Sequence, residues 1–299
     1  MPGGPKTTTI LNTHLQTESR WIARLVFPLF AMLGCCVASG VAYGGTALVA
    51  HYGISMIDVP FGQIVWTVDI GERAYHASAR GKASGPLSVL VKGDGSVIAR
   101  GVMDHGRPMP ETYTSSITDD DGLATVAMTL DQGTVGALQV KAPPPPDDLM
   151  PLRESDRHGV SDPLSAMLIT APPGQDVLSP QSCNRVLAIF DGQRRYDLVL
   201  SYLRRDRLAV KRGYVGPVLV CRLTLKPIAG YRAKSLLIKY VAGRKDMELW
   251  FAPLAGAQIM APVRILMPTI IGTLEIAADQ FEATSTPDVP AEPSDVLKP

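Results

Sequence analysis

Apolar and polar residues alternate in short runs along most of the chain, and turn residues separate the runs. Residues 63–70, for example, have the period of a strand with one buried face. Two such runs on either side of a short turn containing glycine predict a hairpin. The runs that predict strands are 47–57, 63–70, 75–80, 87–91, 96–102, 115–117, 123–130, 185–190, 195–203, 208–211, 218–227, 235–241, 247–252, 262–268 and 272–282.

One short helix is predicted midway along the chain. Asp162 can cap its free N–H groups, Pro163 suits its first turn, and the turn residues 171–174 end it. The sequence therefore predicts a mostly β fold: one long curved or spiral antiparallel sheet, half-barrel-like, with one short helix midway. A single domain over residues 43–283 accounts for the pattern.

Two proline-rich segments interrupt or end this pattern. Residues 141–152 contain four consecutive prolines, which predict a stiff, extended crossover without donors for a strand ladder. Residues 284–299 combine several prolines with few apolar residues, and this composition predicts a disordered tail.

The N-terminal segment predicts export. Residues 1–24 are polar and mildly basic, whereas residues 25–50 carry no charge. A basic start, an apolar stretch and then small residues are typical of a secretory signal peptide. The uncharged stretch is also long enough to span a bilayer as an uncleaved anchor, which would give the protein a membrane contact. We therefore expect residues 1–42 to be a signal peptide or an N-terminal membrane anchor, with the cleaved signal peptide favoured, and both predict a periplasmic domain.

Two cysteines, Cys183 and Cys221, lie beyond this segment. In an oxidising compartment a structural disulfide between them is the favoured prediction. Unpaired buried thiols are the alternative. A catalytic thiol would need a histidine partner within hydrogen-bond range.

Charge and motifs narrow the function classes. With 29 Lys and Arg against 28 Asp and Glu, the net charge is +1, so no basic face for nucleic acid is expected. The chain carries none of the common hydrolase, metalloprotease or phosphate-loop motifs. We therefore expect a non-enzymatic protein with no cofactor, no metal and no catalytic residues.

Four aromatic residues are candidates for lining an apolar ligand in a curved sheet, namely Tyr196, Tyr202, Trp250 and Phe251. Core aromatics without a ligand are the alternative for the same residues. In the ligand-binding interpretation, Trp250→Ala should weaken the binding of a fluorescent fatty acid.

Two arginines beside the predicted turn at Asp191-Gly192 are candidates for anion contact. Arg194 and Arg195 offer planar forks of donors that suit a phosphate or carboxylate. Local pairing with neighbouring aspartates is the alternative.

Three strings together resemble a known family: VSDPLSA at 160–166, FDGQRRYDL at 190–198, and LWF at 249–251 followed by APVR at 261–264. They resemble an exported proteobacterial family of unknown function, similar in layout to periplasmic envelope-integrity proteins that fold as a spiral β-sheet with a bridged cysteine pair. The resemblance implies a location and a fold but no reaction.

The combined expectation is a non-enzymatic periplasmic envelope protein that holds a lipid or other apolar ligand in its curved sheet and supports envelope integrity. A scaffold that contacts envelope proteins or glycan without a small ligand is the first alternative. A cryptic hydrolase is the second.

Overall fold

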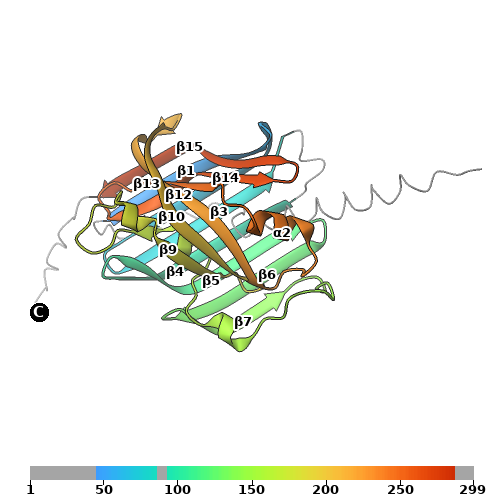
Figure 1. Ribbon diagram of the computed structural model, residues 1–299. Helices are drawn as coiled ribbons and strands as arrows, with labels where there is room; N and C mark the ends of the chain where they lie inside the picture. The colour runs from blue at the N-terminus through green and yellow to red at the C-terminus, as the bar shows by residue number, and fades with distance from the viewer. Residues whose placement is uncertain (1–44, 86–92, 287–299) are drawn as a thin grey trace, which may run out of the picture.

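A computed structural model describes residues 45–85 and 93–286 of this chain (Figure 1). The predictions for residues 1–42 and 87–91, and for most of the tail, lie outside the described residues. Within these ranges, no helix has the length and apolar character needed to cross a membrane.

The fold is one large sheet of fifteen strands, almost wholly antiparallel and not closed, which confirms the predicted fold class. Its main path runs β7-β6-β5-β4-β3-β2-β1-β15-β14-β13-β12-β10-β9, with β8 and β11 paired at its sides. The strands are β1 (Gly45–Met56), β2 (Val59–Ile70), β3 (Ala74–Ala83), β4 (Gly93–Asp104), β5 (Arg107–Asp119), β6 (Gly122–Asp131), β7 (Thr134–Lys141), β8 (Ile169–Thr170), β9 (Arg185–Phe190), β10 (Arg195–Ala209), β11 (Arg212–Gly213), β12 (Val215–Ala229), β13 (Met247–Pro253), β14 (Ile259–Thr269) and β15 (Gly272–Thr286).

A sheet this long must curl, because each strand is twisted relative to its neighbour. Figure 1 shows β10 and β12 crossing in front of β3, β4 and β5, so that the two halves of one sheet face each other. Alternate residues of β1, such as Leu48, Ala50 and Ile54, are buried on the face that looks inward. Across the interior, the Tyr52 hydroxyl donates to the Pro262 carbonyl at 2.7 Å.

The two ends of the open sheet meet at a seam, which is bridged by residues 160–161 rather than by pairing between strands. Val160 N–H donates to the Gly133 carbonyl in the β6–β7 turn at 2.9 Å, and Ser161 N–H donates to the Ala188 carbonyl in β9 at 2.8 Å. The β9–β10 turn also reaches β6, where Gly192 lies against the Val126 side chain. Residues 160–161 therefore tie both ends of the open sheet together.

The short helix predicted after Asp162 is not an α-helix of two to three turns. The structure has only a 3₁₀ turn there, η4 (Ser165–Met167), because Leu168 is extended and the next residues pair with β14 as strand β8. Asp162 does accept from the free N–H groups as the sequence predicted. The other 3₁₀ turns are η3 (Glu154–Arg157) and η5 (Pro180–Ser182).

The one α-helix among the described residues is α2 (Leu236–Ala242), where the sequence pattern predicted a strand. The Ser235 side chain accepts from Ile238 N–H and starts the helix, while Leu237 and Val241 lie buried one turn apart. A short apolar run cannot by itself distinguish a strand from a helix.

Two strand boundaries and the packing of the proline crossover also go beyond the prediction. The segment Gly93–Gly95 lies between the predicted strands 87–91 and 96–102, yet it belongs to β4, because it pairs with β3 and β5. Strand β15 extends to Thr286, so residues 284–286 are strand rather than tail. The proline crossover is irregular as predicted, but it packs against the end of β12, where Met150 and Tyr231 are hydrogen bonded.

Candidate functional site

A small hollow with wholly apolar walls lies on the inner face of the sheet. Its volume is about 30 Å³. Strands β1, β2 and β3 form one side of it, and β14 and β15 form the other. The lining residues are Tyr52, Ile64, Trp66, Ala79, Leu164, Met167, Pro262, Ile265 and Ile276. An apolar void of this kind remains dry, because water would find no hydrogen-bond partners in it.

Two of the lining side chains come from the η4 turn rather than from the sheet. Leu164 and Met167 are both buried, and together they plug the inner face. The Asp162 Oδ1 atom accepts from the N–H groups of Leu164 at 2.9 Å and Ser165 at 3.0 Å. The Ser165 hydroxyl is bonded to the Tyr75 hydroxyl of β3 at 2.6 Å. Polar contacts thus position an apolar plug.

Two buried polar atoms near this plug have no hydrogen-bond partner among the described residues. One is the indole Nε1 of Trp66, whose ring lines the hollow. The other is Oδ2 of Asp162, two residues before Leu164. Burial raises the pKa of Asp162 to about 6, although the hydrogen bonds to its other oxygen oppose that shift. An unpaired buried donor is unfavourable by about 1–3 kcal/mol. No polar atom of the described residues forms part of the surface of the hollow, so this N–H is not exposed to it in the structure as it stands.

The structure does not bring the four predicted aromatic residues together in a cavity. Tyr196 packs edge-on against Tyr231 with ring centroids 6.3 Å apart, and Tyr202 is 37% exposed on β10. Phe251 is fully buried in the inner-face core. Trp250 lies on the opposite face of β13, since it pairs with Arg264 while its neighbour Leu249 pairs with the hollow-lining Ile265.

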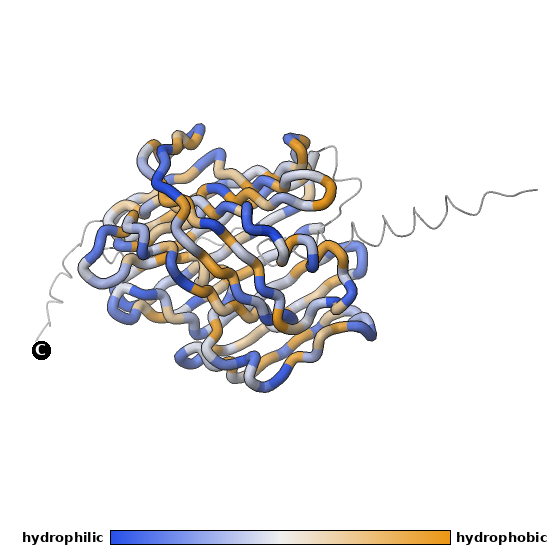
Figure 2. The backbone as a smooth tube through the Cα atoms, viewed as in Figure 1, coloured by the Kyte–Doolittle hydropathy of each residue, from blue (hydrophilic) through white to orange (hydrophobic). Residues whose placement is uncertain are grey.

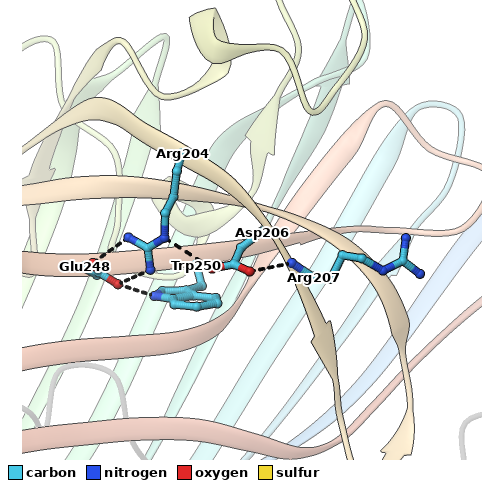
Figure 3. A network of polar contacts seen from close by, with 5 residues as sticks. All are labelled: Arg204, Asp206, Arg207, Glu248 and Trp250. Carbon is cyan, nitrogen blue, oxygen red and sulfur yellow. Dashed lines mark hydrogen bonds and ion pairs between the residues drawn. The ribbon is translucent and has the colours of Figure 1, made fainter.

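Trp250 belongs to a polar network on the outer face (Figure 3). The Arg204 guanidinium donates to both Glu248 oxygens, at 2.8 and 3.1 Å, and Trp250 Nε1 donates to Glu248 Oε2 at 2.8 Å. Arg204 and Arg264 both stack on the Trp250 ring, 5.0 and 5.3 Å from its centroid. The bonds from Arg204 hold the pKa of Glu248 below its usual value. These contacts tie β10, β13 and β14 together.

The two predicted anion-binding arginines, Arg194 and Arg195, have different partners. Arg195 donates to Asp197 at 2.6 Å and to the Tyr196 carbonyl at 2.7 Å, so it is engaged within its own strand. Arg194 lies 3.4 Å from Asp191 and borders a second hollow of about 100 Å³. That hollow lies under the proline crossover and is lined by residues 142–146 together with the β5–β6 turn.

The predicted cysteine bridge is present. Cys183 and Cys221 form a disulfide with their Cα atoms 5.5 Å apart, and both residues are fully buried. It fastens the η5 turn to β12. A bridge of this kind is typical of an oxidising compartment.

The hollow residues Tyr52, Trp66 and Ile276 were not singled out by the sequence. They are inner-face positions of alternating strands, and most other buried residues of those strands follow the same alternation. Whether the Trp66 N–H finds a hydrogen-bond partner depends on the residues that pack around it in the folded protein. No local sequence signal could therefore have identified it. Across residues 45–85 and 93–286, no three His, Cys, Asp or Glu side chains are grouped as metal ligands.

The fold and the hollow define a class: an open, curled antiparallel sheet with a plugged apolar inner face. Within that class, the chain belongs to DUF3108, a protein family of unknown function, whose family model matches residues 48–279. A similar solved structure is the "Beta-barrel-like Protein of Domain of Unknown Function DUF1849 from Brucella abortus", with 9% identity and a TM-score of 0.43 over 82% of this chain and 100% of that chain. No curated protein matches the sequence.

Proposed function

We propose that this protein is a non-enzymatic periplasmic envelope protein that binds the acyl chain of a lipid, or a similar apolar ligand, on the inner face of its curled sheet. The observation that carries the proposal is the hollow with wholly apolar walls on the inner face, which is closed by side chains of a short turn rather than of the sheet. Apolar walls favour a hydrocarbon chain. Once the plug withdraws, the buried N–H of Trp66, whose ring lines the hollow, can donate to one ligand acceptor such as an ester or carboxyl oxygen.

The ligand enters by displacing the plug. The hollow as it stands holds about 30 Å³, which is far smaller than an acyl chain. Leu164 and Met167 close the hollow, and neither belongs to the sheet ladder: Met167 ends the η4 turn, and Leu164 immediately precedes it. Their withdrawal enlarges the hollow without breaking any strand pairing along the main path of the sheet.

The test is a titration of the purified protein with a fluorescent fatty acid, using variants that change the hollow in opposite directions. Ala79→Val fills the hollow and should weaken binding about tenfold, whereas Leu164→Ala removes part of the plug and should strengthen it. Trp250→Phe is the matched control, because Trp250 lies on the outer face, and it should leave binding unchanged.

Thermal melting of each variant separates lost binding from lost folding. The proposal is overturned if the wild type binds no probe, or if Ala79→Val melts like the wild type and binds as tightly. Native mass spectrometry of protein purified from the periplasm should in addition show a co-purified lipid. A folded protein that binds no probe and carries no lipid would favour a scaffold instead.

A further inference from the structure

Two turns at one end of the sheet hold three isoleucines in solvent. Ile57 follows β1 and is 62% exposed, while Ile270 and Ile271 lie between β14 and β15 and are 51% and 49% exposed. We call these three residues the isoleucine tip. The two turns lie side by side, because Ile57 N–H donates to the Thr273 carbonyl at 3.2 Å and Gly272 packs against the Ile57 side chain. Both turns lie at the upper right of Figure 1, and Figure 2 shows hydrophobic positions in each.

The backbone holds the tip rigidly in an unfavourable arrangement. Ile57 and Asp58 have φ values of 51° and 62°, a left-handed conformation that a hairpin turn normally gives to asparagine and glycine. A β-branched residue is rarely found there. In the other turn, the Thr269 hydroxyl donates to the Gly272 carbonyl at 2.7 Å and accepts from Ile271 N–H. Conformations of this kind persist mainly at sites with a function.

We propose that the isoleucine tip docks on the surface of a lipid bilayer. Three half-exposed side chains offer far less than the roughly 800 Å² per partner that a stable protein dimer buries. The tip protrudes as two narrow turns, which suits penetration between lipid headgroups. Residues 56–62 and 267–273 carry a single charge, Asp58, so no attraction to anionic lipid is needed.

The position of the tip connects it to the hollow. Met56, Met267 and Leu274 continue the inner face from the hollow to the tip. Tyr52, which lines the hollow, is four residues from Met56, or roughly 13 Å along a strand. For this step the inference rests on the proposed function: the docked tip would place the end of the inner face against the membrane that supplies the acyl chain.

The first experiment places an indole in the tip of the full-length protein. Ile271→Trp should give a blue shift in emission on addition of phosphatidylcholine vesicles, and brominated lipid should quench the introduced fluorescence. Val215→Trp is the matched control, since Val215 is 69% exposed at the start of β12, and it should show neither effect. Subtracting the wild-type emission spectrum removes the signal of the native tryptophans. Because the introduced indole reports only on its own surroundings, a membrane contact made by residues 1–42 does not produce the shift.

The second experiment separates docking from ligand binding. Ile270→Asp combined with Ile271→Asp should slow transfer of a fluorescent fatty acid from vesicles about tenfold or more, while binding of the same probe from solution stays unchanged. Equal emission shifts for Ile271→Trp and Val215→Trp, or no shift for Ile271→Trp, would overturn the proposal that the isoleucine tip docks on a bilayer. So would a concentration-dependent dimer that the double variant abolishes. If the wild type does not bind the fatty acid from solution, the proposed function is refuted, whereas the docking of the tip is not.

Discussion

Trp250 and Phe251 are neighbours in β13 and lie on opposite faces of the curled sheet. Phe251 is fully buried in the inner-face core, whereas Trp250 is stacked between Arg204 and Arg264 on the outer face. The two aromatic residues that the sequence grouped as one candidate ligand site therefore have different tasks.

The first prediction follows from this separation. We expect Phe251→Ala to lower the free energy of unfolding by about 3–5 kcal/mol, because it leaves a cavity in the core. Trp250→Phe keeps a buried aromatic ring but removes one hydrogen bond to the half-buried Glu248, and it should lower the free energy of unfolding by about 1 kcal/mol. Urea denaturation measures both values. A larger loss for Trp250→Phe than for Phe251→Ala would contradict the assignment of faces.

The disulfide gives a second prediction. Cys183 and Cys221 are 38 residues apart, so their bridge restricts the unfolded chain and should stabilise the fold by about 4 kcal/mol. Cys183→Ser, or reduction of the wild type, should lower the melting temperature and expose residues near the η5 turn to protease. Peptide mapping without reductant should recover the two cysteine peptides joined. Alkylation of both thiols in the unreduced protein would refute the bridge.

The third prediction concerns pH and Asp162. Burial raises the pKa of this carboxyl from 3.8 to about 6 in the folded protein. The protonated group is therefore favoured by folding, so its contribution to stability is fully present below about pH 4. That contribution is lost as the pH rises to about 6, and the loss is roughly 3 kcal/mol.

Asp162→Asn is the matched variant, since its side-chain oxygen still accepts from the N–H groups of Leu164 and Ser165. We expect the wild type to lose stability relative to Asp162→Asn between about pH 4 and pH 6, and the difference to be constant above that range. Urea titrations at half-unit pH intervals measure it. A difference that does not change with pH would show that the carboxyl ionises normally.

The seam of the open sheet supports a fourth prediction. Gly192 has φ of 93° and packs against Val126 of β6, where a Cβ atom would lie 2.3 Å from the valine side chain. Gly192→Ala should therefore combine backbone strain with a clash and destabilise the protein by about 2–3 kcal/mol. Gly174→Ala is the control: it has φ of 73° but no neighbour within 4 Å, so it should cost only about 1 kcal/mol. Equal losses in thermal melting would indicate that the seam is loose.

The sequence by itself determined most of the strands and the β architecture of this protein, although it missed β7 and assigned a strand to the segment that forms α2. Alternation of apolar and polar residues has a period of two only in a strand, and the turns at Asp119–Gly122 and Asp191–Gly192 join the hairpins as predicted. A chain made almost wholly of such hairpins must form one curled sheet. The two cysteines beyond residue 42 were paired for a similar reason: no other partner was present in that part of the sequence.

Only the tertiary structure decided which side chains meet. The segment 235–241 is a helix because Leu237 and Val241 find a buried surface one turn apart, which no local propensity could show. Trp66, Leu164 and Ile276 come from three separate parts of the chain and line one hollow only after the sheet has curled. Whether an aromatic residue lies in the core, in a polar network or beside a hollow depends on the strand register and on what crosses the opposite face, and both are set by contacts between residues distant in sequence.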